Sequence, residues 1–337
     1  MRIERFTNLY RDVTKEGTKI PQEKYCLTGQ FPIVDQGQRV IAGWWNDDAG
    51  IFKNVPAIIF GDHTRAIKYM EQPFFIGADG VKILRPTNIK DNPKYLYYAL
   101  QAAKIPNLGY SRHFKVVKEL QICIYSRDEQ NEIVRVLEKI DNLIEQRHAE
   151  TTYLDQLVKS RFIELFGDQT ANPYAWQQTS IGACCTLKSG TSLPADRENE
   201  GGAIPYVKVG DMNYPGNEQY ITTSSRFVSE QTAGTGVFPV GTVVFPKRGG
   251  AIGTNKKRLT RIPICADLNV MGVTAGRRLT PQYLMAYFNT VDLGTLNNGS
   301  SVPQINNKDI APLLICIPPM ALQEQFAAFV EQTDKSK

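Results

Sequence analysis

The chain has 337 residues, of which 42% are hydrophobic and 22% are charged. This composition is that of a globular protein with about two domains, which excludes disordered, collagen-like and disulfide-scaffold proteins. The N-terminus lacks the apolar stretch of a signal peptide, and the longest apolar runs are too short to span a membrane. The six cysteines form no CxxC pair and the three histidines are scattered. We therefore expect reduced thiols, no metal site and a cytoplasmic location.

The net charge of +5 is distributed unevenly along the chain. Residues 1–124 carry 18 basic and 12 acidic side chains, and residues 171–317 carry 13 and 9. The segments 125–170 and 318–337 are acidic, with balances of −4 and −1. Basic globular blocks suit a polyanionic partner, because each phosphate contact releases counterions. An excess of this size is also within the ordinary scatter of proteins, so charge alone leaves the partner open.

In chain order, the predicted elements are short β-rich runs between Gly, Pro and Asn residues, and helices that follow a proline. We expect helices at 94–103 and 282–289. The predicted strands lie at 57–60, 81–84, 240–245 and 313–317.

These elements occur twice in the same order. The triplet Ile122-Cys123-Ile124 recurs 193 residues later as Ile315-Cys316-Ile317, and Gln130 matches Gln323 at that offset. Because the order is kept while the offsets change, we interpret the chain as a two-fold repeat whose loops differ in length. Each repeat is expected to be a mixed α/β unit followed by a helix. The upstream pairs are 31–34 with 204–207, 57–60 with 242–245, and 93–96 with 281–284.

Residues 127–166 contain neither Pro nor Gly, which predicts one continuous helix. Ser126 and Glu129 form a capping box before it, and Gly167 closes it. At about 1.5 Å per residue, the helix would be roughly 60 Å long. Apolar residues spaced three and four apart predict a coiled-coil seam, with a partner helix starting near Met320. The alternative is an ordinary surface helix, but 40 residues is far above the usual length of about 11–12.

The sequence contains no recognisable catalytic motif. It lacks GxGxxG, Walker A, [DN]PP[YF] and HExxH patterns, and none of its 21 lysines follows an Asp or Glu by two residues. Ser111 and His113 are two residues apart, and we interpret them as substrate contacts or core rather than as a catalytic pair. We expect no active site and no cofactor in this chain.

Two pairs of polar loops are the candidate DNA-reading segments. One pair follows the strands that end at Phe60 and Phe245, and the other precedes the closing strand of each repeat. Arg, Lys, His and Asn can bond to base edges, and glycine lets the backbone approach phosphates; a solvated turn is the alternative. The candidate DNA-binding residues are His63, Thr64, Arg65, Ser111, Arg112, His113, Lys247, Arg248, Asn255, Lys256, Lys257, Arg258, Ser300, Ser301 and Gln304.

The chain resembles the specificity (S) subunits of type I restriction-modification systems over nearly its whole length. Five motifs carry this resemblance, each of them weak alone but specific in this duplicated order. They are EQNEI at 129–133, LQEQF at 322–326, FIELFGD at 162–168, IPYVKVGD at 204–211 and GDHTR at 61–65.

The resemblance implies a mixed α/β fold with two target-recognition domains separated by long helices that form an antiparallel coiled coil. It implies recognition domains at 1–124 and 169–317 and a spacer helix at 125–168. Residues 318–337 would begin a second conserved helix, which usually continues further in the family.

Each recognition domain of such a subunit reads one half of a bipartite target in double-stranded DNA. The helices set the spacing and dock two modification (methyltransferase) subunits, which bind S-adenosylmethionine and methylate adenine N6. Restriction (endonuclease/translocase) subunits complete the complex, and the S subunit itself is non-catalytic.

Two other functions stay open at this point. One is a two-headed structural adaptor that holds two protein partners and no DNA. The other is a stand-alone enzyme that combines restriction and methylation, which would need a cofactor site and a catalytic motif. The alternation of basic and acidic segments favours DNA recognition, and a salt-dependent gel shift would discriminate it from the adaptor.

Overall fold

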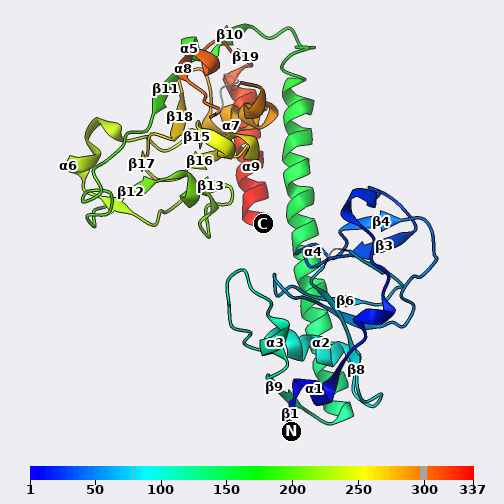
Figure 1. The fold of residues 1–337 in the computed structure, drawn as a ribbon. Coiled ribbons are helices and arrows are strands. Elements are labelled where there is room, and N and C mark those ends of the chain that lie inside the picture. Colours follow the sequence, from blue (N-terminus) through cyan, green and yellow to red (C-terminus); the bar gives the residue numbers. More distant parts are fainter. Residues whose placement is uncertain (78, 297–301) are drawn as a thin grey trace. The chain divides into compact units, whose positions relative to one another are not determined.

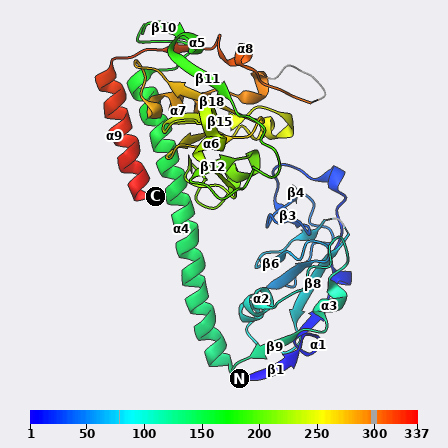
Figure 2. The ribbon, with the colours of Figure 1, turned by 90° about the vertical axis from the view of Figure 1, so that its left-hand side faces the viewer.

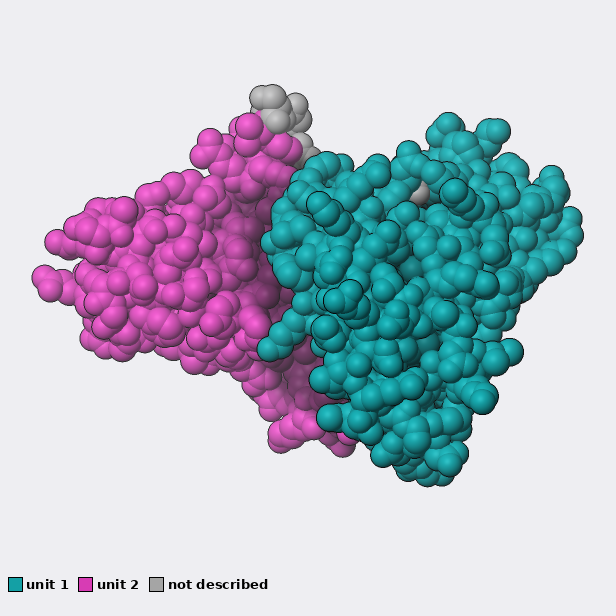
Figure 3. All heavy atoms as spheres, turned by 60° about the horizontal axis from the view of Figure 1, so that its bottom comes forward, with its two compact units in different colours: residues 1–146 teal, residues 147–337 magenta. Residues whose placement is uncertain are grey.

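The computed structural model describes residues 1–77, 79–296 and 302–337. The chain divides into two compact units, which we call unit 1 (residues 1–146) and unit 2 (residues 147–337) (Figure 3). Helix α4 (Arg127–Phe166) contributes its first half to unit 1 and its second half to unit 2.

Unit 1 is built on a four-stranded antiparallel sheet in the order β2-β8-β5-β6, of which Figure 1 labels β6 and β8. A second sheet has the order β4-β3-β7, with β3 and β7 parallel, and β1 pairs with β9. All five residues of β5 are buried, as expected of a central strand with an apolar run. The strands are β1 (Arg2–Arg5), β2 (Tyr10–Asp12), β3 (Phe31–Val34), β4 (Gly43–Trp45), β5 (Ala57–Gly61), β6 (Ile67–Met70), β7 (Phe75–Ile76), β8 (Val81–Pro86) and β9 (Gln121–Ile124).

Helix α2 of unit 1 starts where the sequence signals it. In α2 the proline takes the first position and the side chain of Asn92 accepts hydrogen bonds from the next two backbone N–H groups, which is a normal N-cap. The helices are α1 (Phe6–Leu9), α2 (Pro93–Ala102) and α3 (Phe114–Val117), with 3₁₀ turns η1 (Thr14–Glu16) and η2 (Gln22–Lys24).

Unit 2 contains a five-stranded sheet in the order β11-β18-β15-β16-β13, in which β13 and β16 are parallel. A three-stranded sheet has the order β14-β12-β17, with β12 and β17 parallel, and β10 pairs with β19. The strands are β10 (Gln178–Ser180), β11 (Cys185–Ser189), β12 (Ile204–Val207), β13 (Tyr220–Ile221), β14 (Phe227–Val228), β15 (Thr242–Pro246), β16 (Arg258–Thr260), β17 (Cys265–Ala266), β18 (Val270–Ala275) and β19 (Leu314–Cys316).

The helices of unit 2 include one, α7, that corresponds to α2 of unit 1. Thr280 caps α7 through its side chain, and a proline again takes the first helical position. The helices are α5 (Ile181–Cys184), α6 (Glu230–Ala233), α7 (Pro281–Thr290), α8 (Asn307–Ile310) and α9 (Met320–Ser336), with 3₁₀ turns η3 (Val209–Asn213), η4 (Gly234–Gly236), η5 (Gly249–Thr254) and η6 (Leu293–Leu296).

The two units share one topology. The order β2-β8-β5-β6 in unit 1 corresponds to β11-β18-β15-β16 in unit 2, and the parallel pair β3-β7 corresponds to β12-β17. The helices α2, α3 and the start of α4 correspond to α7, α8 and α9. The predicted two-fold repeat and the mixed α/β fold class are therefore confirmed.

Helix α4 begins and ends where the sequence predicts. At its start Glu129 accepts hydrogen bonds from the backbone N–H and the hydroxyl of Ser126, at 2.9 and 2.7 Å. At its end Gly167 has a φ of +75° and its N–H donates to the carbonyl of Ile163, so the glycine supplies the left-handed residue of a helix C-cap.

Within unit 2, α9 lies antiparallel beside the second half of α4 (Figures 1 and 2). The ring of Phe326, near the start of α9, is 5.6 Å from Phe162 and 5.5 Å from Phe166, centroid to centroid. At the other end of α9, Lys337 Nζ lies 2.7 Å from a carboxylate oxygen of Asp155. The predicted helix pair is confirmed for this part of α4.

Candidate nucleic-acid interface

In unit 1 the two predicted loops are joined by a buried aspartate. The carbonyl of Asp62, just after β5, accepts a hydrogen bond from the backbone N–H of His113 at 2.8 Å. The carboxylate of Asp62 accepts another from the N–H of Phe114 at 2.7 Å. Asp62 is 3% exposed, so these bonds are shielded from water and fix one loop on the other.

His113 supports this loop pair rather than lying at its surface. Its side chain is fully buried, with Nδ1 2.9 Å from the carbonyl of Asp62. Its Nε2 accepts a hydrogen bond from the backbone N–H of Leu108 at 3.1 Å. These partners suit a neutral imidazole that donates from Nδ1 and accepts at Nε2. The predicted site residue His113 therefore holds the 107–113 loop in shape.

The exposed part of this surface contains Thr64, Ser111 and Arg112. The ring of His63 is half-buried and stacks on Tyr110, with centroids 5.3 Å apart and planes at 20°. Tyr110 is 94% exposed, so one face of this aromatic pair is open to a ligand. Sequence reasoning chose the loop but did not select Tyr110; an aromatic residue in an otherwise polar Gly-containing segment was the available signal.

The side chain of Arg65 makes a hydrogen bond within unit 1. Its backbone has a φ of +60°, which is unusual for a residue with a side chain. Its Nη1 donates to the carbonyl of Ile105 at 3.2 Å, which ties the turn after β5 to the segment that follows α2.

Unit 2 pairs its two predicted loops in the same manner. The backbone N–H of Ile305 donates to the carbonyl of Lys247 at 2.9 Å, and that of Gly249 donates to the carbonyl of Pro303 at 2.8 Å. Residues 248 and 304 form a β-bridge between them. Both units therefore present one surface made from two loops. Ser300 and Ser301, predicted in the second of these loops, lie outside the described residues.

Arg248 and the glycines after it form the exposed part of the unit 2 surface. Arg248 is exposed, and a Cβ placed on Gly249, Gly250 or Gly253 would have no atom within 4 Å. The backbone of turn η5 therefore has open space beside these three glycines. Lys247 is half-buried and donates to Ser189 Oγ at 2.9 Å; burial, and then the nearby Arg248, lower the pKa of its ammonium group.

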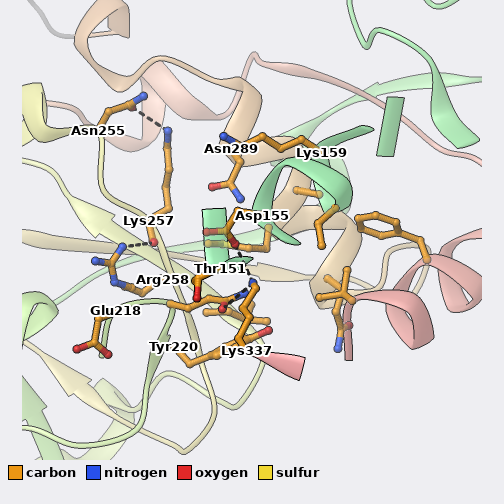
Figure 4. Close-up of a pocket in the computed structure, with 18 residues that line it drawn as sticks. Thr151, Asp155, Lys159, Glu218, Tyr220, Asn255, Lys257, Arg258, Asn289 and Lys337 are labelled. Carbon is orange, nitrogen blue, oxygen red and sulfur yellow. Dashed lines mark hydrogen bonds and ion pairs between the residues drawn. The ribbon is translucent and has the colours of Figure 1, made fainter. Parts of the chain in front are cut away.

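The side chains of Lys257 and Arg258, which follow turn η5, point into the interior of unit 2 (Figure 4). Lys257 is 5% exposed, and its Nζ donates to the carbonyl of Val291 at 2.6 Å and to Asn255 Oδ1 at 2.8 Å. Burial lowers the pKa of Lys257 to about 8. Arg258 donates from Nε to the carbonyl of Asn217 at 2.6 Å, and burial lowers the pKa of its guanidinium group.

These two side chains line a cavity of about 390 Å³ between β16, α7, α9 and the second half of α4. Lys257 and Arg258 face this cavity, and Asn255 also lines it. Although Asn255 is exposed as a residue, its Oδ1 accepts a hydrogen bond from the N–H of Leu293 at 2.9 Å. Lys256 is half-buried and donates to the side chain of Asn213. Gln304, in the loop paired with Arg248, donates to Asn306 Oδ1 at 2.9 Å.

In the described parts of the chain, His, Cys, Asp and Glu side chains form no group that could hold a metal ion. Within the same residues, no helix combines the length and the apolar character needed to cross a membrane.

Comparison with solved structures gives a match over the whole chain. The S subunit of a type I restriction-modification system from M. genitalium has a TM-score of 0.61 to this chain. The alignment covers 99% of this chain and 89% of the other at 16% identity, and it shows a shared fold.

Two relatives come from Methanocaldococcus jannaschii. The type I restriction enzyme MjaIX specificity subunit is 23% identical over 240 residues, which are 64% of this chain and 54% of that protein. The putative type I restriction enzyme MjaX specificity subunit is 21% identical over 294 residues, which are 77% of this chain and 66% of that protein. The chain thus spans between about half and two thirds of the length of these relatives.

The family described as type I restriction modification DNA specificity domain matches residues 11–153 and again residues 173–337. Each match takes in one of the two structural repeats. This chain therefore belongs to the family of type I restriction modification DNA specificity domains.

Proposed function

We propose that this chain is the DNA-recognition subunit of a type I restriction-modification complex, and that each unit reads one half of a bipartite target in double-stranded DNA. The observation that carries the proposal is the paired-loop surface found in both units. Each surface is fixed by backbone hydrogen bonds between its two loops and presents an exposed arginine, Arg112 in unit 1 and Arg248 in unit 2. A rigid loop pair with an exposed guanidinium group suits the bidentate recognition of guanine or phosphate.

Within the predicted site we propose different roles for exposed and buried side chains. Exposed residues such as Thr64, Arg112 and Arg248 contact DNA directly. Buried residues such as His113 and Lys257 hold the loops in the conformation that binds DNA. The proposed domains are recognition domains at 1–124 and 169–317, the spacer helix at 125–168 and the second conserved helix from 318 to 337.

The partners follow from the family. We propose that the helices dock two modification subunits, which bind S-adenosylmethionine and methylate adenine, and that restriction subunits join this complex. The chain itself would supply no catalytic group and no cofactor site. Its contribution is the choice of DNA sequence and of the distance between the two half-sites.

The test is to co-purify the chain with its modification subunits and to measure DNA binding and methylation. Arg112→Ala and Arg248→Ala should each weaken binding by about 1–3 kcal/mol and relax one half of the methylated motif. Arg277→Ala is the matched control, because Arg277 is an exposed arginine between β18 and α7, away from the paired loops. Salt-independent binding, or none with the modification subunits present, would contradict the proposal in favour of an adaptor that binds proteins alone.

A further inference from the structure

The cavity of about 390 Å³ in unit 2 is lined by both apolar and charged side chains (Figure 4). Val158 of α4, Leu259 of β16 and Ala286 of α7 belong to its apolar lining. The charged lining has four basic and two acidic members, namely Lys159, Lys257, Arg258, Lys337, Asp155 and Glu218. Because basic groups are in excess and apolar surface lies beside them, the cavity suits a ligand that joins an anionic group to an apolar body.

The two carboxylates of this lining already have partners within unit 2. Asp155 forms an ion pair with Lys337, with 2.7 Å between Oδ1 and Nζ. Glu218 accepts a hydrogen bond from the backbone N–H of Gly216 at 3.1 Å. In the described parts of the chain, three of the four basic residues form no ion pair with a carboxylate: Lys159, Lys257 and Arg258. An anion that enters the cavity therefore meets cations that the fold has not neutralised.

Lys257 and Arg258 have hydrogen-bond donors that the fold does not use. The ammonium group of Lys257 has three N–H groups, of which two donate to Asn255 and Val291. The guanidinium group of Arg258 uses Nε and Nη1 for backbone carbonyls, and among the described residues its Nη2 has no partner. Lys257 is 5% exposed, and a buried ammonium group without a carboxylate costs free energy that a bound anion would offset.

The equivalent position in unit 1 has a carboxylate partner for its cation. Lys68 of β6 pairs with Ile59 of β5, as Arg258 of β16 pairs with Val244 of β15, so the two basic residues correspond. Lys68 Nζ lies 3.4 Å from Oδ1 of Asp35 and donates to the backbone carbonyl of the same residue at 2.7 Å. Unit 1 thus neutralises the cation of this strand from within its own fold.

Unit 2 has a lysine where unit 1 has that carboxylate. Lys208 directly follows β12, as Asp35 directly follows the equivalent strand β3. Lys257 lies one position before Arg258, where unit 1 has the apolar residue Ile67. Both differences make this part of unit 2 more basic than its equivalent in unit 1. A bound anion can take the place of the missing carboxylate.

We propose that this cavity is a binding site for a small organic phosphate, a phosphate monoester with an apolar or aromatic body such as a nucleoside monophosphate. A phosphate monoester carries a charge of about −1.5 to −2 at pH 7 and three acceptor oxygens, which suit the unused donors of Lys257 and Arg258 and the ammonium group of Lys159. The volume lies in the range of about 300–1,000 Å³ that is typical of small-molecule sites, which leaves room for the body.

Such a ligand would join two elements of unit 2. Lys159 belongs to α4 and Lys257 to the segment before β16, so a phosphate bound to both links the helix to the sheet. The inference is independent of the proposed DNA recognition, because it concerns the cavity and not the paired loops.

The test is isothermal titration calorimetry of the full chain with four probes. Adenosine 5′-monophosphate and phenyl phosphate are the two phosphate monoesters, and at least one of them should bind. Binding of the first alone identifies the ligand as a nucleotide, and binding of both identifies any aryl or nucleoside phosphate. Adenosine lacks the charge and inorganic phosphate lacks the body, so each should bind at least about tenfold more weakly.

Three variants locate the site. Lys159→Met should raise the Kd of the monoester about tenfold, and because this residue is exposed the variant should fold normally. Lys139→Met, which removes another exposed lysine of α4, is the matched control and should leave the Kd unchanged. Ala286→Tyr introduces the residue that α2 carries at the equivalent position, Tyr98, and should prevent binding by narrowing the cavity.

The proposal is overturned if neither monoester binds, or if adenosine or inorganic phosphate binds as tightly as the monoesters. Equal Kd values for Lys159→Met and Lys139→Met would also overturn it. Loss of binding in Arg248→Ala would have the same meaning, because the phosphate would then lie on the paired loops.

Discussion

Gln130 and Gln323, 193 residues apart, make the same buried hydrogen bonds in the two units. The Oε1 atom of each accepts the backbone N–H of a helix N-cap residue, Asn92 at 2.7 Å and Thr280 at 2.9 Å. The Nε2 atom of each donates to the carbonyl five residues earlier, at 3.0 and 2.9 Å. Both side chains are at most 1% exposed. One glutamine thus fixes the start of α2 to α4, and the other fixes α7 to α9.

Gln130→Ala should destabilise unit 1, because it leaves buried donors and acceptors without partners. The expected cost is about 2–3 kcal/mol, measured by amide hydrogen exchange of α2. Gln323→Ala should have the same effect on α7 in unit 2. Gln325→Ala is the control, since that glutamine is exposed two positions beyond Gln323 in α9, and it should cost under about 0.5 kcal/mol. Equal exchange in all three variants would contradict a structural role for the buried pair.

Lys257 should make the stability of unit 2 depend on pH. Its pKa is lowered from 10.5 to about 8 by burial, so between these values the unfolded chain binds a proton that the folded unit does not. The contribution of Lys257 to the stability of unit 2 therefore rises with pH across this window. Lys257→Met should remove that rise, which amounts to about 3 kcal/mol at about 1.4 kcal/mol per pKa unit. Urea unfolding at pH 7.5 and pH 10 measures it, and Lys256→Met should keep the rise.

Tyr110 and Arg112 should affect DNA binding differently. Arg112→Ala removes a charge, so it should reduce the dependence of affinity on salt as well as the affinity itself. Tyr110→Ala removes an aromatic surface, so it should lower affinity while the salt dependence stays the same. Titrations of target duplex at several salt concentrations, with the modification subunits bound, separate the two. If both variants changed the salt dependence equally, stacking by Tyr110 would not be part of recognition.

Inserting seven residues after Gln146 should lengthen α4 by about 10 Å and keep its apolar seam in phase. If α4 sets the distance between two DNA readers, the unread gap in the methylated motif should grow by up to about three base pairs, at about 3.4 Å each. Methylome sequencing reads this gap directly. An insertion of four residues should disturb the seam and weaken assembly instead. A motif that is unchanged by the heptad would show that α4 is no spacer.

Local signals predicted the repeat and its helices well. The 40-residue stretch without Pro or Gly forms α4 with the predicted bounds, and a proline is the first residue of both α2 and α7. These features depend on residues close together in the chain, so sequence alone carries them. The order of strands in the sheets cannot be predicted from such local features, because the pairing of β1 with β9 joins residues more than a hundred positions apart.

The sequence predicted the four loops of the candidate site. It did not predict which of their side chains face outward. Lys256, Lys257 and Arg258 are consecutive, yet Lys257 is buried through a bond to Val291, 34 residues away. His113 is buried beside Asp62, 51 residues away, whose carbonyl oxygen lies 2.9 Å from its Nδ1. Such partners are set by tertiary packing, which a run of basic residues does not reveal. Sequence reasoning did not select Tyr110, because its stacking on His63 depends on the fold.

The spacing between the repeats has a genetic consequence. The offset is 173 residues at β3 and β12 and 185 at β5 and β15, but it stays at 193 from α3 and α8 through to the starts of α4 and α9. A crossover between the two copies within this last stretch would keep the Gln130 and Gln323 bonds and the phase of the helix that follows. A crossover further upstream would change loop lengths instead. The ends of the repeats, next to α4 and α9, are therefore where gene exchange can join new combinations without unfolding the product.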